Sequence, residues 1–422
     1  MKNVSKSLTF LDLFAGAGGM SEGFIRAGFS PVAHVESNKA ACLTLKTRTA
    51  YHWLKERGQL NVYWDYLNGK ITRDDLYGSV LKQHILSVIN AEIKKETLQD
   101  IFRKVDMLSG GKSPDLIIGG PPCQAYSVVG RSRDKNGMIG DRRNYLYEFY
   151  AQFLVRFKPR YFVFENVTGL LSARDGNAER HLDNMIKLFK EVGYETEIRI
   201  LSADDYGVLQ QRRRVILVGN RAEKKDYFPD PELWKPGVFV QEVLSDLPSL
   251  KAGGGSMGPL QLRDYSGTYL NNSGIRTDND WVTLHSARPH NERDLEIYRI
   301  AVEQWDKSSE RLRYSALPAL LKTHTNEVDF ADRFKVVAAD LPASQTVVAH
   351  IAKDGHYYIH PDIKQNRSLT PREAARLQTF PDDYYFENEP GKFGRTAPFR
   401  QIGNAVPVLL AQRIAESLMK TW

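Results

Sequence analysis

Short apolar segments alternate with helical ones through the first half of the chain, and this rhythm constrains the fold more than any other feature. The segments that indicate strands span 8–14, 31–35, 115–119, 161–165, 195–201 and 215–219. Between them, helical patterns occupy 21–27, a stretch from about 38, 145–157 and 179–191, while 74–101 is predicted to be mostly helical. Strands that are almost wholly apolar are typical of a largely parallel sheet covered by helices on both faces. We therefore predict an α/β fold.

The rhythm stops after about residue 220. Prolines at 229, 231, 236 and 248 and the glycine-rich run 251–260 interrupt the pattern. Helical order returns at 370–378 and 406–419. We predict a first domain over 1–220, a second, irregular domain over 221–366, and a C-terminal segment, 367–422, that returns to pack on the first domain.

Composition excludes several classes of protein. With 42% hydrophobic and 26% charged residues, the chain is neither wholly disordered nor fibrous. Its two cysteines rule out a disulfide framework and a multi-cysteine zinc site. It shows no signal peptide and no run near the roughly 18 apolar residues of a membrane span, so we expect a soluble, cytoplasmic protein. The net charge of +7 fits a nucleic-acid partner, but many enzymes are equally basic.

A glycine-rich turn follows the first predicted strand. Gly16, Gly18 and Gly19 lie there, and glycine at a strand-to-helix turn lets the backbone approach a ligand closely. The turn is not the dinucleotide fingerprint, because Ser21 stands where the third glycine is needed. Glu36 ends the second predicted strand, where a carboxylate can accept hydrogen bonds from ribose hydroxyls. The pattern favours a nucleoside-type cofactor; a plain glycine turn with a surface glutamate is the alternative.

The two cysteines differ in their surroundings. Cys123 lies in the run GGPPCQ, directly after the strand at 115–119. Ligands and catalytic groups collect at such strand ends in open α/β sheets. A thiolate in this position can attack an electrophile. Cys42, on a predicted helix, is better explained as a small core residue. We therefore predict that Cys123 is a nucleophile.

Two further polar groups are predicted at the same edge. Glu165 ends the strand at 161–165, and Arg212, Arg213 and Arg214 precede the last strand. If that strand runs antiparallel to its neighbours, the arginines point to this edge, where a guanidinium could hold a phosphate or a base oxygen. A solvated face or an ion-pair cluster is the usual role of adjacent arginines. The loop 131–143 has five basic and two acidic residues, which fits a DNA-facing loop or a plain surface loop equally well.

Six segments, in this order, resemble the motifs of the DNA cytosine-5 methyltransferases: FLDLFAGAGG, GGPPCQAYS, FENV, QQRRRVILVG, LTPREAARLQTFPDDY and QIGNAVP. The resemblance covers about 8–220 and 367–418, and 221–366 corresponds in position to that family's variable target-recognition region. It implies an α/β, Rossmann-like S-adenosylmethionine-dependent methyltransferase domain with a smaller irregular target-recognition domain. Leu209 departs from the family, which often has proline there.

The resemblance also implies roles for individual residues. Cofactor binding is expected at Phe14, Ala15, Gly16, Ala17, Gly18, Gly19, Glu36, Ser37, Asp100, Ile101, Pro122, Leu146, Asn404 and Ala405. Catalysis is expected of Cys123, of Glu165, which would grip the target cytosine, and of Arg212 and Arg214, which would hold the flipped nucleotide. DNA contacts are expected at Gln124, Ser127, Arg131, Arg133, Gln210 and Thr346, the last in a Thr-Val pair like the one that often ends the recognition region. No metal is expected.

The implied reaction explains these residue types. Carbon 5 of cytosine is a poor nucleophile, and addition of a thiolate at carbon 6 makes it enamine-like. Glu165 in its protonated form can donate to ring N3 and accept from the exocyclic amine. Carbon 5 then takes the sulfonium methyl group, S-adenosylhomocysteine is the product, and loss of the carbon-5 proton with β-elimination frees Cys123. The base must leave the duplex to be reached, at a cost of roughly a few kcal/mol.

The expected partner is double-stranded DNA, with a cognate restriction endonuclease or other defence components as possible companions of a prokaryotic monomer. Three alternatives stay open. The first is an RNA cytosine methyltransferase, although those acting on transfer RNA typically lack the long region seen here. The second is a catalytically inactive binding module on the same fold, which the intact set of Cys123, Glu165, Arg212 and Arg214 opposes. The third is a nucleotide-dependent oxidoreductase, which the missing third glycine opposes.

Overall fold

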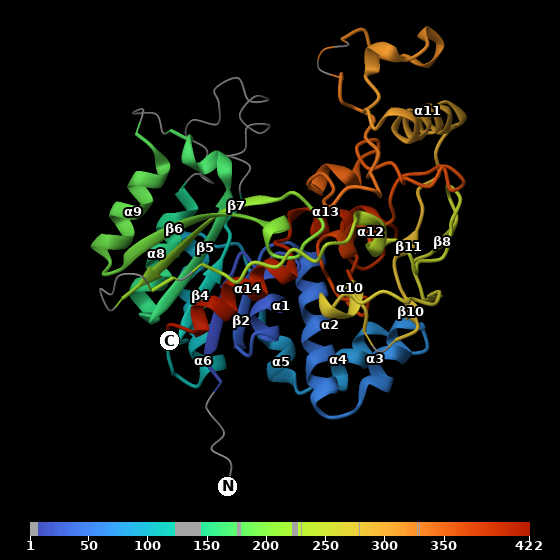
Figure 1. The fold of residues 1–422 in the computed structure, drawn as a ribbon. Helices are drawn as coiled ribbons and strands as arrows, with labels where there is room; N and C mark the ends of the chain where they lie inside the picture. The colour runs from blue at the N-terminus through green and yellow to red at the C-terminus, as the bar shows by residue number, and fades with distance from the viewer. Residues whose placement is uncertain are drawn as a thin grey trace.

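A seven-stranded mixed sheet forms the centre of one half of the molecule (Figure 1). The computed structural model describes residues 7–122, 145–174, 179–221, 227–228, 230–277, 279–326, 328 and 330–422. The strands are β1 (Thr9–Leu13), β2 (Ser30–Glu36), β3 (Val88–Asn90), β4 (Leu116–Gly119), β5 (Tyr161–Val167), β6 (Glu195–Ser202) and β7 (Arg213–Asn220). They are ordered β3-β2-β1-β4-β5-β7-β6. The predicted α/β fold is confirmed, and each predicted strand is present.

Strand β7 is antiparallel to both of its neighbours, β5 and β6. The other neighbouring strands run parallel. The segment 74–101 is mostly helical, as predicted, with α4 (Arg73–Gly78), α5 (Lys82–Leu86) and the start of α6 (Lys95–Ser109), but strand β3 lies inside it and was not predicted. A strand of three residues at the sheet edge is too short to show a period of two, and the helices around it dominate the sequence pattern.

Alternate residues of the central strands point into two different cores, one on each face of the sheet. One core contains Leu11, Ile117 and Phe164 and is covered by α6 (Lys95–Ser109), α8 (Leu146–Phe157) and α9 (His181–Glu191). The other contains Phe10, Ile118 and Val163 and is covered by α1 (Gly19–Arg26) and α14 (Val408–Met419). The sheet is thus the middle of three layers, and a helix from the C-terminal segment completes one of them.

The other half of the molecule is irregular, as expected (Figure 1). Its helices are α10 (Tyr269–Asn272), α11 (Glu292–Ser308), α12 (Pro371–Leu377) and α13 (Thr396–Asn404). Its strands, β8 (Gly255–Ser256), β9 (Leu260–Gln261), β10 (Trp281–Val282) and β11 (His285–Ser286), form two short antiparallel pairs. Leu284, Val337 and Tyr358 share a buried cluster with Ala375 and Ile402 of the C-terminal segment. The domain limits at 220 and 366 stay a prediction.

Four helices connect β2 to β3. They are α2 (Lys39–Glu56), α3 (Leu60–Leu67), α4 (Arg73–Gly78) and α5 (Lys82–Leu86). Tyr51, Tyr63 and Leu76 lie in a small core of their own. None of the helices in the described ranges is long and apolar enough to cross a membrane.

Candidate active site at the carboxyl edge of the sheet

The ends of four strands meet at one edge of the sheet. Leu13, the last residue of β1, pairs with Gly119, the last residue of β4. Gly119 pairs in turn with Phe164 of β5, and Val167 of β5 pairs with Arg214 near the start of β7. Because β7 is antiparallel, the arginines before it reach the same edge as the carboxyl ends of the parallel strands. We predicted this placement on the condition that the last strand runs antiparallel to its neighbours.

The glycine-rich turn encloses the carboxylate of Glu36. The backbone N–H of Gly16 donates to Oε2 of Glu36 at 2.8 Å, and the N–H of Asn38 donates to Oε1 at 2.7 Å. Phe14, Gly16 and Gly18 have positive φ angles of 56°, 55° and 81°. A Cβ on Gly18 would also come within 2.8 Å of Leu45 and Tyr384, so this position excludes a side chain twice over. The turn and the carboxylate form a cradle of the kind a nucleoside needs.

The motif QIGNAVP lies directly against this turn. A Cβ on Gly19 would come within 2.3 Å of the carbonyl oxygen of Val406 and 3.3 Å of Cβ of Ala405. Asn404 ends α13 and is exposed, whereas Ala405 is buried. The beginning of the chain and its C-terminal segment therefore build one wall of the edge together.

Substituting Gly19 by alanine is expected to lower both stability and affinity for the expected cofactor. The new Cβ would meet a backbone oxygen that cannot rotate away, so α1 or the QIGNAVP segment must shift, and overpacking of this kind costs about 1–3 kcal/mol. Denaturant titration gives the free energy of unfolding, and calorimetry gives the affinity. Gly78→Ala is the matched control, because Gly78 ends α4 in open space. Equal stability and affinity of Gly19→Ala and wild type would contradict the close approach.

Glu165 and Arg214 form an ion pair at the centre of the edge. Nε of Arg214 lies 2.6 Å from Oε1 of Glu165, and the two side chains are 11% and 13% exposed. The backbone of Gly120 passes so close that a Cβ there would lie 2.6 Å from Oε2 of Glu165. The amide of Asn166 donates to the carbonyl of Pro121 at 3.4 Å. The GGPP run is thus fixed across the end of β5, within reach of the carboxylate.

Several predicted residues follow this run but lie outside the described residues. They are Cys123, Gln124, Ser127, Arg131 and Arg133. Pro122, the last described residue before them, is exposed. Leu146, at the start of α8, is half-buried.

Arg212, predicted to hold the flipped nucleotide, and Gln210, predicted to contact DNA, are both buried within the protein. The guanidinium of Arg212, 1% exposed, donates to the carbonyls of Val347, Ala405 and Gly403 at 2.7, 2.8 and 3.2 Å. Gln210 is also buried; it donates to the carbonyl of Leu377 and accepts from the N–H of Val347. A buried cation needs several oxygen partners, and converging backbone carbonyls supply them here. Arg212 and Gln210 therefore tie segments together in this structure, and their contacts with DNA stay a prediction.

Thr346 lies beside these two residues and is half-buried. Its hydroxyl donates to the carbonyl of Gln211, next to the start of β7. The end of the predicted recognition region is thus attached to the strand that carries Arg214.

Asp100 and Ile101, which are predicted to bind the cofactor, both lie on α6. Asp100 lies in the second turn of α6, where its exposed carboxylate pairs with Arg103 and Lys104, and Ile101 is fully buried in the core. The residues that the structure brings beside Glu36 belong to the end of β3: Asn90 pairs with Glu36, and the N–H of Ala91 donates to its carbonyl. The short strand β3 was not recognised in the sequence, and the cofactor role of Asp100 and Ile101 stays a prediction.

Sequence reasoning missed a buried polar network behind the glycine turn. Arg48 of α2 donates to both carboxylate oxygens of Glu22, at 2.6 and 2.9 Å, and to Asp383 at 2.8 Å. The hydroxyl of Tyr384 donates to the carbonyl of Ala17 in the turn itself. Burial alone would raise the pKa of Glu22, but Arg48 and His52 outweigh it and hold that pKa well below its usual range. Arg48, a charged residue among the apolar positions of α2, was the sequence feature that could have indicated this network.

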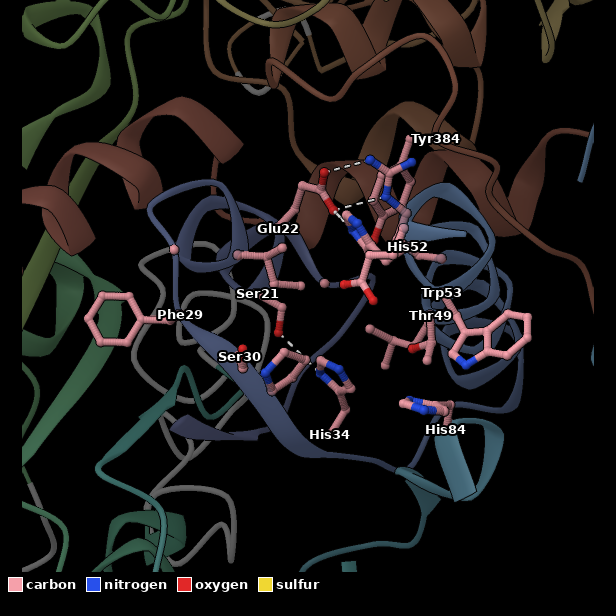
Figure 2. Close-up of a pocket in the computed structure, with 17 residues that line it drawn as sticks. Ser21, Glu22, Phe29, Ser30, His34, Thr49, His52, Trp53, His84 and Tyr384 are labelled. Atoms are coloured by element: carbon pink, nitrogen blue, oxygen red, sulfur yellow. Dashed lines mark hydrogen bonds and ion pairs between the residues drawn. The ribbon is translucent and has the colours of Figure 1, made fainter. Parts of the chain in front are cut away.

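A cavity of about 370 Å³ lies beside this network, between α1, α2 and the start of β2 (Figure 2). His34, Trp53 and His84 line it, and Ser21 bonds to His34 in its wall. Of the predicted cofactor residues, its lining includes only Gly18; it also includes Ser30, at the opposite end of β2 from Glu36. It is therefore separate from the predicted cofactor edge. Among the described residues, no three His, Cys, Asp or Glu side chains group to hold a metal ion.

Known proteins resemble this chain over nearly its whole length. The sequence model of the C-5 cytosine-specific DNA methylase family matches 8–61 and 77–420. The type II methyltransferase M.Bpa9945I of Bacillus paralicheniformis is 40% identical, over 97% of this chain and 98% of the relative. The type II methyltransferase M1.HphI of Haemophilus parahaemolyticus is 29% identical, over 98% and 87%.

Solved structures share the fold. An E. coli prophage-encoded protein described as a DNA modification methyltransferase superposes with a TM-score of 0.61 and 22% identity, over 98% of this chain and 99% of that one. The Entamoeba histolytica methyltransferase EhMeth superposes with a TM-score of 0.53 and 12% identity, over 99% of each chain. The predicted Rossmann-like methyltransferase fold is thus confirmed.

Proposed function

The chain belongs to the C-5 cytosine-specific DNA methylase family and is a DNA cytosine-5 methyltransferase of the restriction-modification type; we propose that its methyl donor is S-adenosylmethionine and that it acts on a cytosine flipped out of duplex DNA. One observation carries the proposal. The glycine turn with Glu36 and the Glu165–Arg214 pair meet at one sheet edge, beside the loop that leads to Cys123.

The residues at the edge fit the proposed cofactor. The turn presents backbone N–H groups and positions where a Cβ would clash, and the Glu36 oxygens have capacity left to accept from ribose hydroxyls. When bound, S-adenosylmethionine supplies an electrophilic methyl group on a sulfonium. Ala405 and Val406 lie against the turn from the C-terminal side, and Asn404, which ends α13 beside them, would close the pocket there.

The chain's own groups prepare the cytosine. We propose that the Cys123 thiolate adds to carbon 6, which raises the electron density on carbon 5. Glu165, protonated on Oε2, donates to ring N3 as negative charge develops and accepts from the exocyclic amine. Arg214 holds Oε1 from one side, and Oε2 lies on the side of the GGPP run, so Oε2 would give its proton to N3 while Oε1 keeps a lone pair for the exocyclic amine. Once carbon 5 carries the methyl group, a water molecule would take the carbon-5 proton, the thiolate would leave carbon 6, and Glu165 would recover its proton from N3.

Sequence readout would fall to the region between β7 and α12. Relatives named type II methyltransferases support a role in marking DNA against a cognate endonuclease. We propose that the enzyme acts as a monomer on one duplex site.

Incubation with tritiated S-adenosylmethionine and mixed-sequence duplex DNA tests the proposal. Label is expected in 5-methylcytosine after digestion of the DNA. Label found only in RNA, or in N4-methylcytosine, would contradict it. Bisulfite sequencing of DNA from cells that express the chain then identifies the site.

A further inference from the structure

Helices α3 and α4 contain a stretch that the family model does not match, 62–76. These residues form most of α3, the α3–α4 turn and the start of α4. They contact a segment far away in the sequence, 383–388, which begins with the last two residues of the motif LTPREAARLQTFPDDY. An insertion that served only as surface decoration would have no need of buried polar partners in the core of the enzyme.

Three side chains of the insertion make these contacts. The hydroxyl of Tyr63 donates to the carbonyl of Asp383 at 2.7 Å. The hydroxyl of Tyr66 donates to Oε1 of Glu387 at 2.6 Å, and Arg73 donates to its Oε2 at 2.9 Å. Glu387 is almost fully buried, with its side chain 2% exposed. Burial raises its pKa although Arg73 opposes the shift, so this carboxylate depends on its partners to stay ionised.

The segment held in this way contacts both walls of the proposed cofactor site. Tyr384 donates to the carbonyl of Ala17 and packs against Gly18 in the glycine turn. At the other end, the carbonyl of Glu387 accepts from Nε2 of Gln401 at 2.8 Å. Gln401 belongs to α13, the helix that ends at Asn404. A shift of 383–388 would therefore move the turn and the end of α13 together.

We propose that the inserted α3–α4 element is a positioning device that holds 383–388 and thereby sets the geometry of the cofactor pocket. Tyr66 and Arg73 are positioning residues, because they act through Glu387 and do not reach the glycine turn. The inference rests on the cofactor site proposed above. A competing role in DNA recognition has its own contact, since Trp64 packs edge-to-face on Trp281 of β10 with ring centroids 5.1 Å apart.

Arg73→Met tests the proposal by removing the charge partner of Glu387. We expect the dissociation constant and KM for S-adenosylmethionine to rise about tenfold, since coupling through packed networks has this size. Because Cys123 and Glu165 are untouched, kcat should change little, and DNA affinity should equal that of wild type. Arg73→Lys, which restores a donor and the charge, should recover most of the cofactor affinity. Circular dichroism fixes a temperature at which each variant is folded.

Tyr66→Phe is a second test of the positioning role, and it remains valid if Arg73→Met does not fold. It removes one hydrogen bond and leaves the charge of Glu387 paired, and it should weaken cofactor binding by a smaller factor in the same direction. Lys70→Met is the matched control, because Lys70 lies in the same inserted element and pairs with an exposed carboxylate, Asp65.

The outcomes separate the two proposals. Folded Arg73→Met and Tyr66→Phe with the cofactor affinity of wild type, or with a loss of DNA affinity alone, overturn the positioning role. Wild-type protein that does not bind S-adenosylmethionine overturns the proposed function and this inference together.

Discussion

Replacement of Cys123 by serine should abolish methyl transfer by this chain while its affinities for DNA and for S-adenosylmethionine stay close to those of wild type. A serine hydroxyl ionises far less readily than a thiol, so the addition at carbon 6 is lost. Removal of a catalytic nucleophile costs on the order of 10⁴-fold or more in kcat. Single-turnover transfer of tritium to duplex DNA measures the chemical step, and gel-shift titration measures binding.

The path of the chain into Cys123 supports this expectation. A Cβ on Gly119 would lie 2.4 Å from the carbonyl oxygen of Leu13, and one on Gly120 would lie 2.6 Å from Glu165. The backbone therefore leaves β4 between β1 and the Glu165 carboxylate. Pro121, which restricts the backbone further, is buried and bonded to Asn166. The run that precedes Cys123 in the sequence therefore lies at the same edge as Glu165.

Cys42→Ser is the matched control. Cys42 is 3% exposed in α2, and burial, with the nearby charge of Glu36, raises the pKa of its thiol to about 12. It cannot supply a thiolate near neutral pH, so its substitution should leave most of the activity. Duplex DNA containing 5-fluorocytosine should trap a covalent complex whose peptide map carries the adduct on Cys123. Methylation by Cys123→Ser at the wild-type rate, or an adduct on Cys42, would refute the assignment.

The central strands of the sheet were predictable because each is a local apolar pattern, whereas α11, a helix of 17 residues, was not predicted. Each of β1, β4, β5 and β7 is a short apolar run, and the alternation of its residues between two cores follows from strand geometry. Strand β3 was not predictable, because its three residues carry no period of their own and its place depends on pairing with β2. For the same reason, the contacts of Asn90 and Ala91 with Glu36 could not be predicted.

The candidate site also has parts that were predictable from the sequence and parts that were not. The glycine turn and Glu36 were predictable because each lies at the end of its own strand. The hydrogen bond between Tyr384 and Ala17 was not predictable. The two residues lie 367 positions apart, and they meet only because the C-terminal segment folds back. Arg212 shows the same limit, because its burial by three carbonyls depends on segments that meet only in the folded chain. Local patterns identify strand ends, but they do not say which side chains close over them.

Substituting Glu165 by glutamine should lower kcat by about 10²–10⁴-fold, the range for loss of a general acid. Glutamine keeps a donor for ring N3 and an acceptor for the exocyclic amine, so the flipped cytosine can still bind. It has no proton to transfer as negative charge develops on the ring, so the thiolate addition is slowed. Stopped assays at saturating cofactor and DNA measure kcat, and DNA affinity is measured separately.

Glu197→Gln is the control for a change of charge alone. Glu197 lies on β6 and is 20% exposed, close to the exposure of Glu165, and it pairs with Arg199. It is remote from the residues that meet at the carboxyl edge, since its partner across the ladder is Val218. Its substitution should leave kcat unchanged. If Glu165→Gln weakened DNA binding as much as turnover, the Glu165–Arg214 pair would serve the shape of the pocket and not the chemical step. A fall in kcat at full DNA affinity assigns Glu165 to proton transfer, because no structural role of the pair predicts that separation.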